Sequence, residues 1–186
     1  TRENKIEFTA NNIEYEFSSG KKGLYDFTFK EESGRLVGIM GGSGSGKSTL
    51  LNVLNGNYPP SSGEIKINGI GLYESPKLLE GVIGFVPQDD LLIEELSVFE
   101  NLYYNGKLCF GNYEDDKLVE LVNEVLVSIG LFEAKDLKVG NPLSKTISGG
   151  QRKRLNIALE LIREPSILFV DEPTSGLSSN DSEIIM

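Results

Sequence analysis

The sequence is short of cysteine, of basic residues and of long apolar runs, and each shortage excludes a class of protein. Its single cysteine, Cys109, cannot form an internal disulfide and fits a reducing compartment. Basic residues number 18 against 28 acidic ones, and the net charge of −10 argues against sequence-independent binding of nucleic acid. No apolar stretch approaches the ~18 residues of a membrane span and no apolar leader begins the chain. We therefore expect a chain that is neither secreted nor embedded in a bilayer.

What is present is ordinary for a globular domain. The 186 residues are 39% hydrophobic and 25% charged, which suits one domain with a proper core. The sequence stops at Met186 in the middle of a pattern, so we expect it to be part of a longer protein.

The stretch GGSGSGKST at residues 41–49 has the composition of a flexible linker, but its flanks argue otherwise. The apolar run 35–40 before it predicts a strand buried on both faces, and residues 48–55 after it predict a helix that ends at Gly56. A strand, followed by the pattern G-x-x-x-x-G-K-[ST] and then by a helix, is the signature of a phosphate-binding P-loop. We expect Lys47 to reach the β- and γ-phosphates and Ser48 to bind Mg²⁺. The predicted nucleotide-binding residues are Gly42, Ser43, Gly44, Ser45, Gly46, Lys47, Ser48 and Thr49.

A pair of carboxylates follows a second apolar strand, predicted at residues 167–170. Open α/β sheets bind ligands at the carboxyl ends of their strands, so Asp171 is predicted to hold Mg²⁺. Glu172 is predicted to polarise the water that attacks the γ-phosphate. A solvated Asp-Glu pair before Pro173 is the alternative, and the P-loop favours the catalytic interpretation.

The stretch Ser148, Gly149, Gly150, Gln151 opens another predicted helix, to about Arg163. Ser148 is a good N-cap, and the two glycines leave the amides of the first turn bare, which predicts a second anion site. Two phosphate sites in one chain suggest a nucleotide shared between two copies.

The remaining elements are predicted from the spacing of apolar residues and from the residues that cap helices or form turns. Alternating runs at 5–8, 12–17 and 25–29 predict antiparallel strands, and residues 64–69 and 82–86 predict two more. A capping box at Ser97 predicts a helix to Cys109, and the spacing of apolar residues over 118–129 predicts another that ends at Gly130.

With Gln88 after a buried strand, the motifs at 41–48, 148–151 and 167–172 occur in the order typical of ATP-binding cassette (ABC) ATPases. The chain resembles this family over essentially its whole length, and residues 87–90, 148–156 and 172–177 resemble its G subfamily in particular.

The resemblance implies two cassettes packed head to tail around two ATP molecules, as a homodimer or a heterodimer. Ser148 and Gly150 then meet the nucleotide of the other copy, and Gln88 touches Mg²⁺ and the attacking water. An aromatic residue stacks on adenine; we choose Phe17, with Tyr15 as the runner-up, and the alternative for Phe17 is ordinary sheet core. Arg152, Lys153 and Arg154 are expected to be mostly solvated helix charges.

The chain departs from the family in two respects. It contains no histidine, whereas the family has one that contacts the γ-phosphate after a further strand. Ser178 stands where the family usually has Asp, with Asp181 three residues later. We therefore expect ATP binding to be retained but hydrolysis by this chain to be weak or absent.

The predicted fold is α/β: a P-loop NTPase core of the RecA-like kind, an N-terminal antiparallel β subdomain and a helical insertion. We assign 1–36 and 57–75 mainly to the β subdomain, 37–56, 76–90 and 148–186 to the core, and 91–147 to the helical insertion.

The predicted function is the ATPase of an ABC transporter, with ATP and Mg²⁺ as cofactors. Its expected partners are a second cassette and a transmembrane domain, it is expected at the cytoplasmic face of the cell membrane, and no nucleic acid is expected. The alternatives are a soluble ABC ATPase acting on DNA, ribosomes or repair complexes, and a nucleotide-regulated interaction module without turnover.

Overall fold

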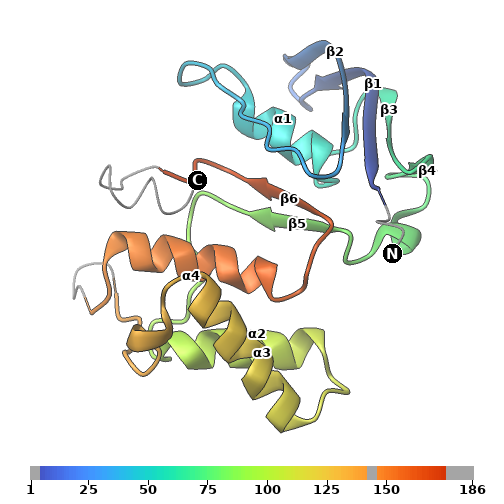
Figure 1. Ribbon diagram of the computed structural model, residues 1–186. Helices are drawn as coiled ribbons and strands as arrows, with labels where there is room; N and C mark the ends of the chain where they lie inside the picture. Colours follow the sequence, from blue (N-terminus) through green and yellow to red (C-terminus); the bar gives the residue numbers. More distant parts are fainter. Residues whose placement is uncertain (1–4, 142–145, 175–186) are drawn as a thin grey trace. The chain divides into compact units, whose positions relative to one another are not determined.

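The structure is a computed structural model that describes residues 5–141 and 146–174 (Figure 1). Its internal contacts divide the chain into two compact units, described here one at a time. The first comprises Thr1–Ile83 and Ser166–Phe169, and the second Gly84–Pro165 and Val170–Met186. The predictions on Ser178 and Asp181 lie outside the described residues. Within the described residues, no helix is long and apolar enough to cross a membrane.

The first unit contains a four-stranded antiparallel sheet in the order β2-β1-β3-β4. Its strands are β1 (Glu7–Glu16), β2 (Lys22–Glu32), β3 (Ser62–Ile67) and β4 (Ile70–Gly71). The two runs predicted at 5–8 and 12–17 form the single strand β1, with a register shift where Asn12 has a φ of 49°. The short asparagine tolerates this conformation better than a branched residue does, so one bulged strand replaces two.

A tight turn joins β3 to β4, as the Asn-Gly pair predicts. Asn68 and Gly69 have φ values of 50° and 79°, the two positive values that a type I′ hairpin turn requires. The short 3₁₀ helix η1 (Pro76–Leu79) follows.

Helix α1 (Lys47–Leu54) covers one face of this sheet and is the helix predicted after the glycine-rich loop. Its side chains join the apolar residues of the strands in one buried core, and the ring of Phe169 meets that of Phe8 with centroids 6.0 Å apart. The buried members of this core are Phe8, Ala10, Ile13, Val53, Leu54, Ile65, Ile67, Leu72 and Leu79.

The strand predicted at residues 35–40 is wrong. These residues have no strand geometry, and Leu36 and Met40 are 81% and 96% exposed. A strand needs a neighbour to pair with its backbone, and none of the ladders among the described residues reaches this segment. The apolar pattern indicates that the segment favours burial, but it does not identify the strand that has to lie beside it.

The second unit is built on three helices: α2 (Val98–Cys109), α3 (Asp115–Ser128) and α4 (Gly149–Leu161), with the short 3₁₀ helix η2 (Phe132–Ala134). All three helices were predicted. Their apolar faces form one core, which includes Leu102, Leu118, Val122, Leu126 and Leu155. The capping box at Ser97 is present, with both of its hydrogen bonds to Glu100.

Strands β5 (Ile83–Val86) and β6 (Ile167–Val170) pair in a second sheet. The amide of Ile167 donates to the carbonyl of Val82 and that of Asp171 to Val86, so the strands run parallel. Both were predicted, although all four residues of β6 are only half-buried.

Candidate functional site

The glycine-rich loop turns directly into α1, and its backbone is one that glycine alone adopts without strain. Gly44 and Gly46 have φ values of 75° and 91°, in the left-handed region. Gly46 is the N-cap of α1, and no side chain caps the helix. The amides of Lys47, Ser48 and Thr49 occupy the first turn and have no acceptor within the helix. This start of α1 is therefore a set of unfilled donors at the positive end of a helix dipole, which suits an anion.

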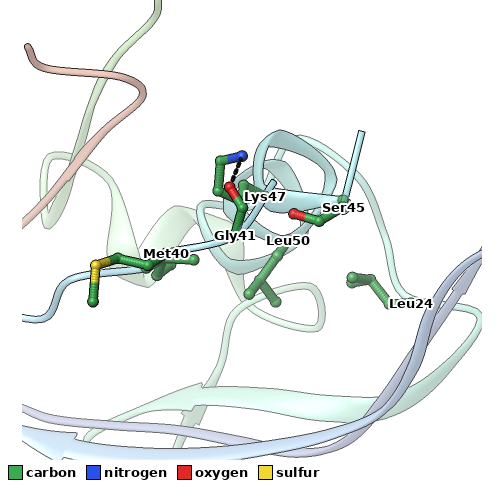
Figure 2. Close-up of a pocket in the computed structure, with 8 residues that line it drawn as sticks. Leu24, Met40, Gly41, Ser45, Lys47 and Leu50 are labelled. Atoms are coloured by element: carbon green, nitrogen blue, oxygen red, sulfur yellow. Dashed lines mark hydrogen bonds between the residues drawn. The ribbon is translucent and has the colours of Figure 1, made fainter. Parts of the chain in front are cut away.

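The Lys47 side chain folds over the same loop. Its Nζ donates to the carbonyl oxygens of Gly41 and Gly42, at 2.9 and 3.0 Å. Figure 2 shows the bond to Gly41 beside a pocket of about 250 Å³. Whole-ligand pockets are typically ~300–1,000 Å³, so this one has room for only a part of a nucleotide. The pocket is lined by Leu24, Ile39, Met40, Gly41, Ser45, Gly46, Lys47 and Leu50.

The two candidate adenine-stacking rings lie side by side, Tyr15 within β1 and Phe17 directly after its last residue. The rings of Tyr15 and Phe17 meet edge to face with centroids 5.1 Å apart, and Tyr15 also stacks on Tyr58 at 5.6 Å. A Cβ on Gly23 would lie 2.7 Å from the Phe17 ring, so a glycine there is what lets this ring approach β2. Both candidate rings are half-buried, and their contact with adenine stays a prediction.

In the second unit, the predicted catalytic residues meet at the carboxyl ends of β5 and β6. Gln88 Nε2 donates to Glu172 Oε2 at 3.1 Å. Asp171 is 7% exposed, and its amide pairs with Val86. Glu172 has a φ of 46°, in the left-handed region that residues other than glycine rarely adopt. Strained backbone of this kind clusters at functional sites. The structure therefore brings Gln88, Asp171 and Glu172 together.

The prediction that residues 152–154 are solvated is wrong for Arg152 and Lys153, which are 8% and 9% exposed. Arg152 forms an ion pair with Asp90, and Lys153 Nζ lies 3.4–3.5 Å from the carbonyl oxygens of Pro87, Gln88 and Asp171. Burial lowers the pKa of Lys153, and the nearby Asp171 and Glu172 carboxylates only partly oppose it.

Two signals point to this error. Asp89 and Asp90, which follow Gln88, offer partners for a basic helix. In addition, α4 has to bury one face, and its apolar residues alone do not fill that face. Arg154 is half-buried. Asn101 and Asn156, which hold the segment after Gln88, were not predicted; both are buried asparagines within helices, and a lone asparagine carries no such signal in the sequence.

The predicted second anion site lies at the start of α4. Ser148 is its N-cap, and the predicted cap is confirmed. Ser148 Oγ accepts from the Gln151 amide at 3.1 Å, and Gln151 Oε1 accepts from the Ser148 amide at 2.7 Å. The amides of Gly149 and Gly150 have no acceptor within the helix. Gly149 is exposed and Gly150 is buried.

The predicted metal ligands are Ser48, Gln88 and Asp171. They offer a hydroxyl, an amide and a carboxylate oxygen, which are the hard oxygen donors that Mg²⁺ prefers. Ser48 belongs to the first unit and is exposed, whereas Gln88 and Asp171 belong to the second. Among the described residues no group of three or more His, Cys, Asp or Glu side chains could hold a metal.

Known proteins resemble the chain over most of its length. The family model described as ABC transporter matches residues 24–175. The chain is 41% identical over 162 residues to ABC transporter G family member 28 of Arabidopsis thaliana, which covers 86% of this chain and 14% of the relative. It is 38% identical over 180 residues to the ABC-type transporter claG of Penicillium crustosum, covering 92% of this chain and 24% of the relative. The chain thus spans a quarter or less of these relatives.

A solved structure shares this fold. It is that of cbiO1 from Clostridium perfringens, described as part of the ABC transporter complex cbiONQ. The TM-score is 0.82 at 31% identity, with 95% of this chain and 70% of the other covered. The P-loop NTPase fold with its antiparallel β subdomain is thereby confirmed. The chain belongs to the ABC transporter family, as one of its nucleotide-binding ATPase domains, and is similar to members of the G subfamily.

Proposed function

We propose that this domain binds MgATP at the start of α1 and hydrolyses it between two head-to-tail cassettes, so that ATP drives transport by a membrane-embedded partner. The observation that carries the proposal is the uncapped, glycine-rich helix start with Lys47 folded over it. The Gln88–Glu172 hydrogen bond adds a polar pair suited to an attacking water.

In binding, Lys47 exchanges its two carbonyl acceptors for phosphate oxygens. The unfilled amides of Lys47, Ser48 and Thr49 donate to the same phosphates, with the backbone of residues 42–46 wrapped around them. Phe17 stacks on adenine, and Tyr15 is the alternative. Tyr15 already stacks on Tyr58, which favours Phe17 as the ring still available on its face.

Ser48, Gln88 and Asp171 would hold Mg²⁺ through oxygen atoms, and the ion would supply the positive charge that neutralises the phosphates. Asp171 is buried, and a buried carboxylate needs a compensating cation, which Lys153 provides in part and Mg²⁺ would complete. Glu172 orients the water and takes its proton, and the Gln88 amide holds the Glu172 carboxylate in place.

Ser148, Gly149, Gly150 and Gln151 act on the nucleotide of the second copy. The Ser148 hydroxyl already accepts from Gln151, and it keeps its own proton to donate to a phosphate. The amides of Gly149 and Gly150 add two more donors. The second cassette is either an identical chain or a related one.

Transport is supported by the names of the relatives, which are transporters, and by a structural neighbour from a transporter complex. These names favour transport over a soluble ABC ATPase or a module without turnover. We place the domain at the cytoplasmic face of the membrane, beside a transmembrane domain in the same or another polypeptide. The net charge of −10 is consistent with a partner other than nucleic acid.

The test uses two variants with opposite signatures. In the full-length protein, Lys47→Ala should abolish saturable MgATP binding, whereas Glu172→Gln should bind MgATP normally and lose at least ~100-fold in hydrolysis. Lys66→Ala is the matched control, because Lys66 forms only an exposed pair with Glu64. Normal binding by Lys47→Ala, or normal turnover by Glu172→Gln, contradicts the proposal.

A further inference from the structure

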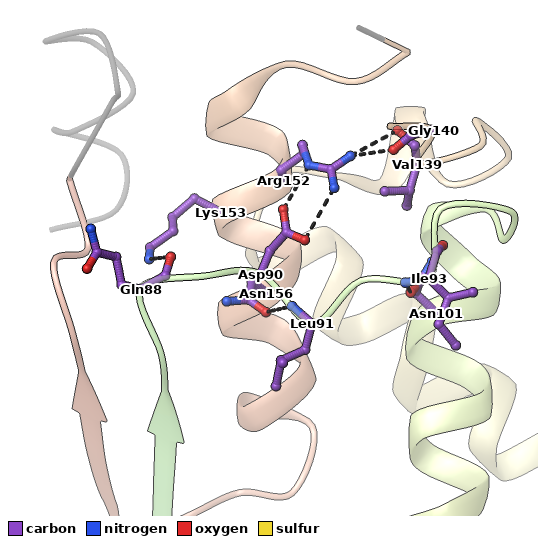
Figure 3. Close-up of polar contacts among 10 residues, drawn as sticks. All are labelled: Gln88, Asp90, Leu91, Ile93, Asn101, Val139, Gly140, Arg152, Lys153 and Asn156. Atoms are coloured by element: carbon purple, nitrogen blue, oxygen red, sulfur yellow. Dashed lines mark hydrogen bonds and ion pairs between the residues drawn. The ribbon is translucent and has the colours of Figure 1, made fainter. Parts of the chain in front are cut away.

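A single buried side chain joins three segments of the second unit. Arg152 Nε donates to Asp90 Oδ2 at 2.9 Å and its Nη2 to Asp90 Oδ1 at 3.3 Å, a two-pronged ion pair. Its remaining nitrogen, Nη1, donates to the carbonyl oxygens of Gly140 and Val139, at 2.5 and 3.4 Å (Figure 3). Only 10% of the Arg152 side chain is exposed. The guanidinium therefore ties α4 to the segment after β5 and to the backbone at residues 139 and 140.

The segment after β5, residues 87–93, has neither helical nor strand geometry, yet buried side chains hold its backbone. Asn156 of α4 accepts from the amide of Leu91 at 3.2 Å. Asn101 of α2 accepts from the amide of Ile93 at 2.8 Å and donates to its carbonyl at 3.1 Å. Figure 3 shows these contacts along one stretch of chain. Two buried asparagines therefore hold the backbone of a segment that has no regular structure.

The contacts from α4 come from one face of the helix, because Arg152, Lys153 and Asn156 fall at positions i, i+1 and i+4. That face begins one turn after Ser148, and the amide of Arg152 donates to the Ser148 carbonyl at 2.9 Å. Because one helical turn is rigid, a displacement of Ser148 should also move Arg152 and, through the ion pair, Asp90. Gln88 lies two residues before Asp90.

We propose that Arg152 and Asp90 form a positioning pair that couples the start of α4 to Gln88. The inference rests on the proposed function, in which Gln88 serves the nucleotide of its own chain and Ser148 serves that of the second copy. When the second nucleotide pulls on Ser148, the pair moves Gln88 and its hydrogen-bonded Glu172. Hydrolysis at one nucleotide thus depends on occupancy of the other.

The competing explanation is that the Arg152–Asp90 ion pair only stabilises the fold. The variants are therefore chosen to keep its charge. Removing one member of a buried pair leaves an uncompensated charge and threatens folding. Arg152→Lys keeps the charge but loses the fork that spans both Asp90 oxygens and the Gly140 carbonyl. Arg163→Lys is the matched control, because Arg163 pairs with Glu160 just past the other end of α4, at 3.8 Å and with 40% of its side chain exposed.

The experiment measures ATP hydrolysis against ATP concentration in the intact, full-length protein, together with MgATP binding and thermal stability. For Arg152→Lys we expect an MgATP Kd within ~2-fold of wild type, because Lys47 and its loop are untouched. We expect kcat to fall ~10-fold or more, since displacing a catalytic group by ~1 Å can cost up to ~100-fold. The dependence on ATP should lose its cooperativity, and Arg163→Lys should change neither quantity.

Rescue separates positioning from simple stability. The double variant Asp90→Glu with Arg152→Lys lengthens one partner as it shortens the other, and should recover part of kcat and of the cooperativity. Equal kcat values for Arg152→Lys and Arg163→Lys overturn the inference, and so does a loss of kcat that merely follows the folded fraction. A wild-type protein without hydrolysis overturns the proposed function instead, which the Glu172→Gln comparison reveals independently.

Discussion

Helices α1 and α4 both begin at a glycine-rich stretch, but they complete their first turns in opposite ways. At α1, Gly46 is a left-handed N-cap and no side chain caps the helix. At α4, Ser148 and Gln151 form a complete capping box. A helix capped by its own side chains forms without help, whereas an uncapped one leaves donors for a ligand. The start of α1 therefore depends on a ligand to pair its amide donors, whereas the start of α4 is already capped before a ligand binds.

The largest expected effect is therefore that of MgATP on stability. At ~100 times its Kd, MgATP should raise the free energy of unfolding by about 2.7 kcal/mol, because it binds the native state alone. Thermal unfolding with and without MgATP measures this gain. At protein concentrations too low for pairing, Ser148→Ala should keep the whole gain and Lys47→Ala should lose it. A gain that depends equally on both residues would remove the distinction between the two helix starts.

The glycines that precede and begin the two helices should respond in opposite directions. Gly46→Ala forces a side chain into a φ of 91° and brings Cβ within 3.4 Å of the Gly23 carbonyl, so it should cost about 1–2 kcal/mol. Gly149 begins α4 in helical geometry and is exposed, so Gly149→Ala should stabilise the fold by about 0.5–1 kcal/mol.

Chemical denaturation of both glycine variants measures the contrast. Equal destabilisation would mean that the two starts obey the same backbone demand. Under the proposed function, Gly149→Ala should nevertheless reduce hydrolysis in the dimer, because a Cβ then projects beside donors meant for the second nucleotide.

Helices α2 and α4 both begin with a capping box, so the box of α2 is a reference for that of α4. Ser97 and Ser148 each cap a helix through the amide of the third residue after them. Each serine-to-alanine change should cost about 1 kcal/mol of unfolding free energy. Only Ser148→Ala should also lower ATP-dependent pairing and hydrolysis. If Ser97→Ala lowers hydrolysis as much, the effect of Ser148 is one of stability alone.

The local signals in the sequence predicted these helix starts well. The capping box of Ser97 with Glu100 and the Asn68-Gly69 turn each depend on residues within four positions of one another, so spacing alone specifies them. Ser148 was predicted as an N-cap, but its pairing with Gln151 was not predicted. The P-loop belongs to the same class. Asp171 and Glu172 could be placed because they come at the end of an apolar strand, whereas Gln88 was chosen from the resemblance to the family.

The errors share a different cause, which is that the partner lies far along the chain. The exposed segment 35–40 was predicted as a strand from its composition, although nothing in it specifies a neighbour. Arg152 and Lys153 were predicted as solvated because helical charges usually are. Asp90 lies 62 residues from Arg152, and the carbonyls of Pro87 and Asp171 lie 66 and 18 residues from Lys153. Periodicity reports which face is buried, and it does not report against what.

The smallest effect concerns the two lysines, and it separates a ligand-binding role from a structural one. Lys47 donates to two carbonyls at 2.9 and 3.0 Å, whereas Lys153 lies 3.4–3.5 Å from three. Folding lowers the pKa of Lys153, chiefly through burial. A lysine whose pKa is lowered by folding destabilises the native state while it is protonated, and this cost fades as the pH rises towards its ordinary pKa of 10.5.

Lys153→Met keeps the length of the side chain and removes the buried charge. At neutral pH we expect its free energy of unfolding to stay within ~0.5 kcal/mol of wild type or to rise, because replacing buried charge by apolar packing is often neutral or stabilising. Any advantage of the variant should shrink between neutral pH and pH 10.5, as the wild-type amine becomes able to lose its proton on folding. Lys47→Met is the matched comparison: it should leave stability without ATP nearly unchanged and abolish the stabilisation by MgATP. A large loss of stability in Lys153→Met would mean that its three long carbonyl contacts outweigh the desolvation of the amine. The lysine of α4 would then be as indispensable to the fold as that of α1 is to the ligand.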